Sequence, residues 1–392
     1  MIIFSKESKI GIVGSGAMGS GIAQVSAAAG HHVIIYDNNK SALDKSKFNL
    51  DSTLKKLVEK QKLTQQLASE IFGRIQFASD LKSFKDCGLV IEAIIENIEI
   101  KQTLFKELES IVAGSCMLAS NTSSLSITSI ASACNKPERV LGIHFFNPAP
   151  LMPLVEIIPG LATDQKVLLE CKKLIDNWGK NTVLAKDTPG FIVNRIARPF
   201  YGESIRVYEE GIADFSTIDW AMKEIGGFKM GPFELMDLIG NDVNYTVTET
   251  VWKQFFYDSR YRPSLTQKRL FEAKRFGKKS GRGYYDYAVG AVVPEPKKDK
   301  VLGEQIFMRV LAMLINEAAD ALYLNIATKE DVDLAMTKGV NYPKGLLKWA
   351  DEIGLNKILK TLTDLRELYC EDRYRPSVLM KNMVKNNQKF FN

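Results

Sequence analysis

The chain is poor in the residues that build metal sites, disulfide frameworks and membrane spans. Its 392 residues include five cysteines without any Cys-x-x-Cys pair, which argues against a zinc site and a disulfide scaffold. We expect each cysteine to be a small buried hydrophobe. No apolar run reaches the roughly 18 residues that span a bilayer, and no cleavage-site pattern follows Met1-Ile2-Ile3. The expectation is a cytoplasmic protein without a membrane partner.

The net charge is also small, and histidines are few. The net charge of +6 is small for this length and is spread along the chain, so a nucleic-acid-binding face is not required. Of the three histidines, His31 and His32 stand between a predicted helix and a predicted strand, where we expect solvated rings. His144 is therefore the outstanding candidate for proton transfer.

His144 begins the pentapeptide His-Phe-Phe-Asn-Pro at 144–148, and Glu156 follows twelve residues after the histidine. The apolar surroundings place an imidazole and a carboxylate in a buried setting, where they can act as an acid/base pair. A core histidine satisfied by backbone groups is the alternative, and this pattern alone does not decide between the two.

Alternating strand and helix patterns fill the first half of the chain. Helices are predicted over 17–29 and 97–112, and strands over 9–14, 32–37, 88–94, 117–120, 140–145, 154–158 and 182–185. This order predicts an α/β fold with a doubly wound sheet of the Rossmann type over residues 1–187. Helical periodicity takes over at Thr188-Pro189-Gly190, which marks a domain boundary.

A glycine-rich turn, Gly14-Ser15-Gly16-Ala17-Met18-Gly19, lies between the first predicted strand and helix. Its glycines allow backbone N–H groups to approach a pyrophosphate at the positive end of the helix. Asp37 ends the next strand, where its carboxylate can accept hydrogen bonds from the ribose hydroxyls and repel a 2′-phosphate. The predicted cofactor is therefore NAD rather than NADP. The alternative to dinucleotide binding is a glycine turn that only allows the helix to pack tightly on the strand.

Polar residues end two later strands, where a doubly wound sheet collects its ligands. Glu96 ends one of them and Lys101 lies one helical turn further, so both can edge the nicotinamide side of the cofactor. The alternative is a solvated ion pair at a helix start. The run Asn121 to Ser124 offers small donors and acceptors, for a ligand or as an N-cap of the next helix.

Several ordered motifs carry a family resemblance. They are the glycine turn with Asp37, the run Ser120 to Ser124, the pentapeptide at 144–148, Thr-Pro-Gly-Phe-Ile-Val-Asn-Arg at 188–195, and the glycine- and tyrosine-rich segment 277–287. Together they resemble the L-3-hydroxyacyl-CoA dehydrogenase family over residues 9 to 287. The resemblance implies NAD-dependent oxidation of an L-3-hydroxyacyl-CoA to a 3-oxoacyl-CoA, as in fatty-acid β-oxidation.

The resemblance also implies roles for single residues. His144 would be the base, Glu156 its orienting carboxylate, and Ser123 and Asn194 the groups that hydrogen-bond the substrate. For Asn194 a helix-terminus cap is the alternative. No metal is expected. The expected cofactor contacts are Gly14, Gly16, Ala17, Met18, Gly19, Asp37, Glu96, Lys101, Ser123 and Asn147.

A lysine-rich stretch over 45–62 looks like an inserted helical pair. In the family that the chain resembles, such an insertion contacts CoA, whose phosphates suit a basic face. Lys55, Lys56 and Lys62 are the candidate contacts, and a solvated surface is the alternative.

The last third of the chain repeats the helical domain. Adding 114 to a residue of the first copy gives the same residue type in the second, as in Arg195/Arg309, Glu203/Glu317, Ala213/Ala327, Asp219/Asp333, Ala221/Ala335, Met222/Met336 and Gly240/Gly354. We predict two homologous all-α domains, 188–287 and 301–392, joined by a linker at 288–300. The second copy has Met308 in place of Asn194 and no glycine-tyrosine tail, so we expect it to be structural.

In the family that the chain resembles, single-copy members pair through their helical domains. A second copy in the same chain can supply that partner internally, so a monomer is expected, with dimerisation elsewhere left open. Two alternatives to an acyl-CoA dehydrogenase remain at this point, a dehydrogenase of a free 3-hydroxy acid and a non-catalytic NAD-binding or structural relative.

Overall fold

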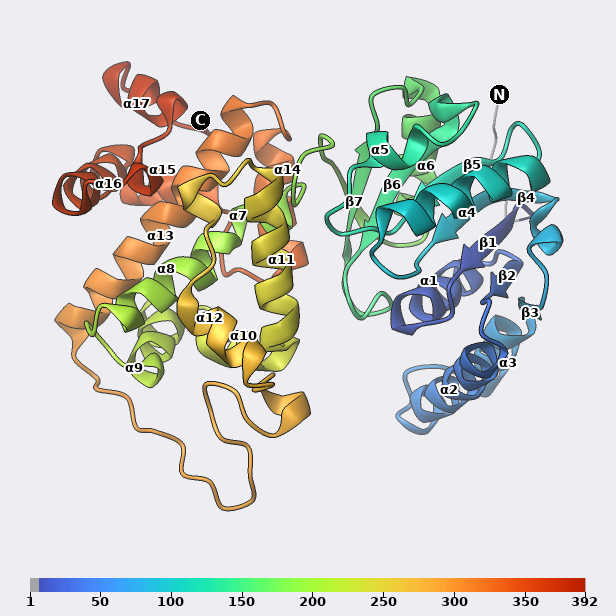
Figure 1. Ribbon diagram of the computed structural model, residues 1–392, viewed down its shortest axis with the longest axis horizontal. Helices are drawn as coiled ribbons and strands as arrows, with labels where there is room; N and C mark the ends of the chain where they lie inside the picture. Colours follow the sequence, from blue (N-terminus) through green and yellow to red (C-terminus); the bar gives the residue numbers. More distant parts are fainter. Residues whose placement is uncertain (1–6, 392) are drawn as a thin grey trace. The chain divides into compact units, whose positions relative to one another are not determined.

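The computed structural model describes residues 7–391 and divides into two compact units, Met1–Thr188 and Pro189–Asn392 (Figure 1). The segment Met1-Ile2-Ile3 lies outside the described residues. The predicted fold class is confirmed, because the first unit is built on a sheet and the second contains helices. Over residues 7–391, no helix has both the length and the apolarity that crossing a bilayer requires.

An eight-stranded sheet forms the centre of the first unit, in the order β3-β2-β1-β4-β5-β6-β7-β8. Its neighbours run parallel except for the antiparallel β6–β7 pair. The strands are β1 (Lys9–Val13), β2 (Val33–Tyr36), β3 (Ile75–Ala78), β4 (Cys87–Glu92), β5 (Met117–Ser120), β6 (Val140–Phe145), β7 (Leu154–Pro159) and β8 (Asn181–Leu184). Every predicted strand is present. Only β3 escaped prediction, because this short edge strand exposes Gln76 and carries little apolar pattern.

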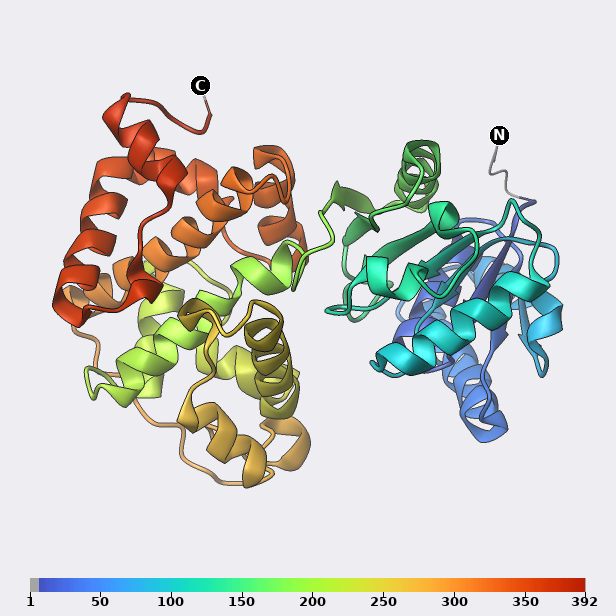
Figure 2. The same ribbon diagram turned by 45° about the horizontal axis from the view of Figure 1, so that its top comes forward.

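Helices cover both faces of this sheet (Figures 1 and 2). Side chains from α1 and α6 join one face in a common apolar core, and α5 packs on β6 from the other face. The lysine-rich stretch belongs to the helical pair α2–α3, as predicted. The helices are α1 (Ala17–Ala28), α2 (Lys40–Glu59), α3 (Gln65–Gly73), α4 (Ile98–Ile111), α5 (Ile127–Ala131) and α6 (Gln165–Asn177), with short 3-10 turns η1 (Leu81–Phe84) and η2 (Pro137–Arg139).

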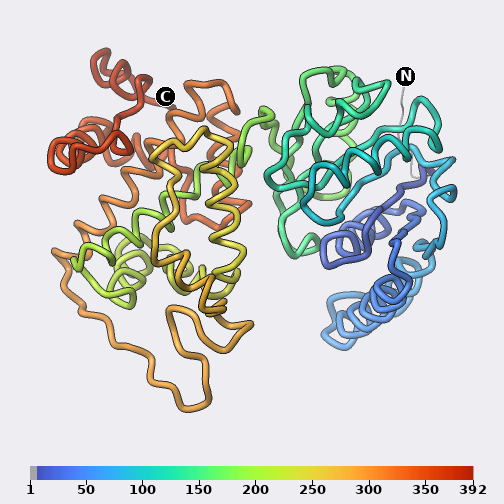
Figure 3. Tube along the Cα trace, viewed as in Figure 1, coloured from blue at the N-terminus to red at the C-terminus, as the bar shows by residue number. Residues whose placement is uncertain are grey.

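The second unit is built around α8 and α13, which lie side by side (Figures 1 and 2). Residues 288–299 have no helix or strand and form the long loop before α13 (Figure 3). The elements are α7 (Val193–Ile196), α8 (Arg198–Glu209), α9 (Phe215–Trp220), the π-helical turn η3 (Ala221–Ile225), α10 (Pro232–Ile239), α11 (Asn241–Gln254), η4 (Ser259–Tyr261), α12 (Leu265–Glu272), η5 (Lys278–Ser280), α13 (Lys300–Tyr323), α14 (Lys329–Gly339), α15 (Leu346–Ile353), α16 (Leu355–Tyr369), η6 (Asp372–Tyr374) and α17 (Val378–Lys385).

Equivalent aspartates begin equivalent helices in the two halves of this unit. Asp219 accepts hydrogen bonds from two backbone N–H groups at the start of α10, and Asp333 does the same at the start of α15. The residues Gly231 and Gly345 precede these helices, and a side chain at either one would collide with the capping aspartate. These contacts explain why both residue types recur 114 positions later.

A tail closes each half through a second pair of aspartates. Asp237 accepts hydrogen bonds of 3.0 and 2.9 Å from the backbone of Tyr284-Tyr285, and Asp351 accepts 3.0 and 2.8 Å bonds from Phe390-Phe391. The second copy has no glycine-tyrosine tail, as read from the sequence. The backbone of Phe390-Phe391 nevertheless makes the same contacts, which depend on N–H groups rather than on side-chain identity.

Reciprocal ion pairs join the two halves of the second unit. Arg195 Nε donates to Glu317 Oε1 at 2.6 Å, and Arg309 Nε donates to Glu203 Oε1 at 2.7 Å. Each pair is the other one shifted by 114 residues, which is the pattern of an interface with twofold symmetry. All four side chains are buried.

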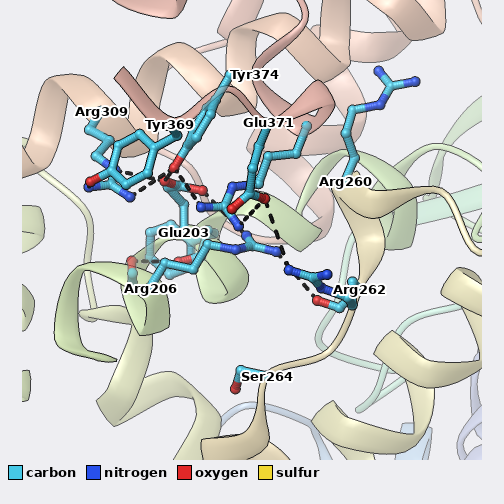
Figure 4. A network of polar contacts seen from close by, with 12 residues as sticks. Glu203, Arg206, Arg260, Arg262, Ser264, Arg309, Tyr369, Glu371 and Tyr374 are labelled. Atoms are coloured by element: carbon cyan, nitrogen blue, oxygen red, sulfur yellow. Dashed lines mark hydrogen bonds and ion pairs between the residues drawn. The ribbon is translucent and has the colours of Figure 1, made fainter. Parts of the chain in front are cut away.

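Further polar groups surround Glu203 (Figure 4). The Tyr374 hydroxyl donates to Glu203 at 2.6 Å, and Arg206 lies 3.3 Å from its other oxygen. Burial alone would raise the pKa of Glu203, but Arg206 and Arg309 outweigh it and hold the pKa below its usual range. Glu203 is thus a buried charge that depends on residues from both halves.

Two expectations about single residues are wrong. The His31 ring is buried, since its Nδ1 lies 3.0 Å from the carbonyl oxygen of Ser8 and the ring packs 5.7 Å from that of Trp178. Cys370 is exposed at the end of α16, whereas the other four cysteines are buried as expected. Neither environment can be read from the flanking sequence, because burial of a side chain depends on whether segments distant in sequence pack against it.

Candidate active site

His144 and Glu156 are direct partners across the antiparallel pair of β6 and β7. Cross-strand partners point to the same face of a sheet, so the side chains meet, and His144 Nδ1 lies 2.7 Å from Glu156 Oε2. Glu156 is fully buried, His144 is 5% exposed, and the Phe146 ring lies 4.5 Å from the imidazole. The chain reverses direction between β6 and β7, and this reversal brings two residues twelve positions apart within hydrogen-bonding distance.

This geometry assigns different tasks to the two imidazole nitrogens. A carboxylate beside Nδ1 favours the tautomer with a proton on that atom and stabilises the imidazolium when the ring gains a second proton. In such an arrangement Nε2 is the nitrogen that can exchange a proton with another group. The arrangement is suited to general acid/base chemistry.

Side chains from neighbouring segments fix the end of β6. The Asn121 side-chain oxygen accepts a hydrogen bond of 2.9 Å from the backbone N–H of Phe145. Lys180 Nζ donates to the carbonyl oxygens of Ala149 and Met152 just beyond the pentapeptide. Asn147, a predicted cofactor contact, is exposed in the loop between these anchors.

The glycine turn is shaped for a close-lying anion. Gly14 has φ +100, and a side chain there would collide with the backbone after β4. A side chain at Gly16 would meet nothing within 4 Å, so this glycine faces open space. The first turn of α1, which contains Ala17, Met18 and Gly19, carries no acidic residue, and no side chain caps its start. Its N–H groups therefore suit a pyrophosphate.

Asp37 is tied to this turn. Its Oδ2 accepts hydrogen bonds of 2.8 Å from both the backbone N–H and the hydroxyl of Ser15, and its Oδ1 accepts one from the backbone N–H of Asn39. The half-buried carboxylate thus stands beside the glycine turn at the carboxyl end of β2. That placement fits the ribose of a dinucleotide.

Lys101 is buried between two glutamates. It is 1% exposed, and its Nζ lies 2.5 Å from Glu92 Oε1 and 3.3 Å from Glu96 Oε2. The alternative of a solvated ion pair is therefore wrong. The sequence analysis gave Glu92 no role, although a glutamate that ends the apolar run Leu89-Val90-Ile91 is itself a signal of a buried charge.

Glu96 connects this ion pair to the loop after β5. Its Oε1 accepts a hydrogen bond of 3.1 Å from the backbone N–H of Ser123, another from the Thr122 hydroxyl, and a third of 3.3 Å from the Ser124 hydroxyl. The N-cap of α5 is Ser126, so the alternative that 121–124 cap this helix is wrong. The loop is bound to Glu96 instead.

The remaining predicted site residues belong to other segments of the chain. Asn194 is the second residue of α7 in the second unit, and because Ile192 is the N-cap, the helix-cap alternative for Asn194 is wrong. Lys55 pairs with Asp51 at 2.7 Å and lines a groove between α2 and α3, while Lys56 and Lys62 are exposed nearby in sequence. Among the residues described, no group of three or more His, Cys, Asp or Glu could hold a metal ion.

Known protein families match nearly the whole chain. The NAD binding domain of 3-hydroxyacyl-CoA dehydrogenase matches residues 9–188. The C-terminal domain of the same family matches twice, at 190–287 and at 306–389. The chain belongs to the 3-hydroxyacyl-CoA dehydrogenase family. It is an NAD-dependent dehydrogenase that oxidises 3-hydroxyacyl-CoA to 3-oxoacyl-CoA.

Individual relatives differ in how much of this dehydrogenase they cover. The 3-hydroxyadipyl-CoA dehydrogenase of Escherichia coli K12 is 36% identical over 95% of this chain and 96% of its own length. Human mitochondrial hydroxyacyl-coenzyme A dehydrogenase is 41% identical, but over 70% of this chain and 90% of its own. The crystal structure of 3-hydroxybutyryl-CoA dehydrogenase from Escherichia coli K12 superposes with a TM-score of 0.92 at 36% identity, covering 97% of this chain and 98% of that one.

Proposed function

We propose that His144 is the general base of this dehydrogenase and that Glu156 orients it. The hydrogen bond of 2.7 Å between His144 Nδ1 and Glu156 Oε2 is the observation that carries this proposal. Nε2 of His144 takes the proton of the 3-hydroxyl group during oxidation and returns it during reduction. Glu156 stabilises the imidazolium without itself changing its protonation state.

When bound, NAD would supply the hydride acceptor for C3 of the substrate. In this proposal the glycine turn with Asp37 holds the dinucleotide, an assignment supported by the open space at Gly16 and the uncapped start of α1. Glu96 and Asn147 lie beside the nicotinamide of the cofactor in this proposal. Lys101 contributes to this part of the site by holding Glu96 in place. No arginine follows Asp37 in Asn38-Asn39 to hold a 2′-phosphate, which supports NAD as the preferred cofactor.

Ser123 and Asn194 hydrogen-bond the reacting oxygen or the thioester carbonyl of the substrate in this proposal. Such contacts fix C3 relative to the base, and positioning of this kind lowers a barrier by several kcal/mol. Lys55, Lys56 and Lys62 contact the phosphates of CoA, supported by their exposure on and beside α2. The relatives of matching length are named for 3-hydroxyadipyl-CoA and 3-hydroxybutyryl-CoA, so we propose a short acyl chain.

For the organisation of the chain, we propose an NAD-binding domain at 1–187 and two homologous helical domains at 188–287 and 301–392, with the linker at 288–300. The reciprocal pairs Arg195–Glu317 and Arg309–Glu203 support internal pairing of the two helical domains. The chain then needs no homodimer through this face. The five unpaired cysteines fit a cytoplasmic location.

The consumption of NADH with 3-oxobutyryl-CoA, 3-oxoadipyl-CoA and longer 3-oxoacyl-CoAs tests the proposed substrate class. We expect the short substrates to give the highest kcat/KM, and free 3-oxo acids to give little turnover. A higher kcat/KM for a free acid than for its CoA ester would contradict the proposal. Ser123→Ala and Asn194→Ala should lower kcat/KM for the acyl-CoA, and Asn194→Ala should leave the affinity for NADH unchanged.

A further inference from the structure

Beneath the loop that carries Ser123 lies a buried cluster of three charges. Glu92 is fully buried, Lys101 is 1% exposed, and Glu96 reaches the surface above them. Lys101 Nζ lies 2.5 Å from Glu92 and 3.3 Å from Glu96, so one ammonium serves two carboxylates. The cluster carries one negative charge in excess.

Such a cluster is a poor way to stabilise a fold. Taking ions out of water costs several kcal/mol for each one, and an apolar replacement of a buried ion pair is often neutral or stabilising. Apolar side chains flank the charges on both elements, because Val90 points to the same face of β4 as Glu92, Phe105 lies one turn after Lys101 on α4, and both are buried. The charges therefore call for an explanation other than cohesion of the core.

Two routes lead from the cluster to the loop after β5. In the first, Lys101 contacts Glu96, which accepts hydrogen bonds from the backbone N–H of Ser123 and from the hydroxyl of Thr122. In the second, Glu92 Oε2 accepts a hydrogen bond of 2.6 Å from the Ser120 hydroxyl, whose oxygen accepts one of 3.1 Å from the backbone N–H of Thr122. Both routes end on the backbone that holds Ser123.

We propose that Glu92 and Lys101 are positioning residues, which hold Glu96 and the loop 120–124 in the conformation that presents Ser123 to the substrate. This inference rests on the proposed role of Ser123 and extends it to two buried residues beneath the loop. Lys101 orients Glu96, and Glu92 orients Lys101.

The protonation equilibrium of Glu96 depends on the ammonium group of Lys101. Burial by itself would raise the pKa of Glu96, but Lys101 and the hydrogen bonds from Thr122 and Ser123 outweigh it and lower the pKa. The charged groups that face Glu96 are Lys101 and, behind it, Glu92, since the loop 120–124 offers hydroxyl and N–H groups there. Removing the ammonium would let Glu96 take up a proton and become a weaker acceptor for the loop.

The pH profile of kcat/KM in Lys101→Met tests the positioning role. Without the ammonium the pKa of Glu96 rises, so the acid limb of the profile should move to higher pH, and activity should recover as the pH is raised. At neutral pH we expect a loss of at least about tenfold in kcat/KM for the acyl-CoA. Lys106→Met is the matched control, because Lys106 is exposed on the same helix and should leave the profile unchanged. An unshifted acid limb in folded Lys101→Met would overturn the proposal.

A second measurement keeps the inference testable if Lys101→Met is unstable. Glu92→Gln preserves shape and removes the charge, and Thr122→Val removes the hydroxyl that donates to Glu96. Because both act on the same loop, their effects on kcat/KM should be non-additive in the double variant. Additive effects would overturn the positioning role. If Ser123→Ala loses activity while the effects of Glu92→Gln and Thr122→Val are additive, the proposed role of Ser123 stands and only the positioning role is refuted. Full activity in Ser123→Ala would refute the proposed role of Ser123.

Discussion

The pair His144 and Glu156 allows separate predictions for the proposed general base and for the carboxylate that orients it. Replacing the imidazole in His144→Gln removes the proton acceptor, and loss of a general base typically lowers turnover by about 10² to 10⁴. Because His144 is not part of the glycine turn, the affinity for NADH should remain close to that of the wild type.

Glu156→Gln should cost less, and the structure allows its magnitude to be worked out. The glutamine oxygen can still accept the hydrogen bond from Nδ1, so the 2.7 Å contact is kept but loses its charge. Hydrogen bonds to charged groups contribute about 1.5–3 kcal/mol, against about 0.5–1.5 kcal/mol for neutral ones. The difference of about 1–1.5 kcal/mol applies when the ring is protonated, and it corresponds to roughly tenfold in rate.

The assay is NADH oxidation under saturating 3-oxobutyryl-CoA, together with NADH binding measured by fluorescence titration. Glu138→Gln is the matched control, because Glu138 is exposed in the same unit and precedes β6 at the end opposite His144. Near-normal turnover in His144→Gln would remove His144 as the base. A larger loss in Glu156→Gln than in His144→Gln would show that Glu156, rather than the histidine, carries the proton.

Three further predictions concern the cofactor and the second unit. Wild-type enzyme should strongly prefer NAD to NADP, and Asp37→Ala should narrow that preference, since it removes both ribose hydrogen bonds and repulsion of a 2′-phosphate; equal kcat/KM for the two cofactors in the wild type would refute this. Glu203→Ala should lower the free energy of urea unfolding by about 3–5 kcal/mol because it removes the carboxylate that pairs with buried Arg206 and one of the two that pair with Arg309, while exposed Glu304→Ala should change it little. Truncation after Tyr287 should expose the face of α8 that α13 covers and cause aggregation or dimerisation, and a soluble, equally stable monomer would contradict internal pairing.

The amino-acid sequence by itself determined the fold class and the position of most strands. Apolar runs such as Val140–Phe145 predict buried strands, and a glycine turn between a strand and a helix indicates a phosphate site. The repeat at an offset of 114 was equally visible, because Asp219 and Asp333 must recur with the helices that they cap. These features depend on contacts close in sequence or on periodicity.

Tertiary structure decided which polar groups meet. The sequence put Glu156 twelve residues from His144, but only the antiparallel register of β6 and β7 brings their side chains to 2.7 Å. It put Lys101 near a helix start, where the alternative to a cofactor contact was a solvated ion pair, and the packing of α4 against the sheet buried it beside Glu92. The solvation and partners of a charged side chain depend on segments that arrive from elsewhere in the chain, so neither follows from local sequence.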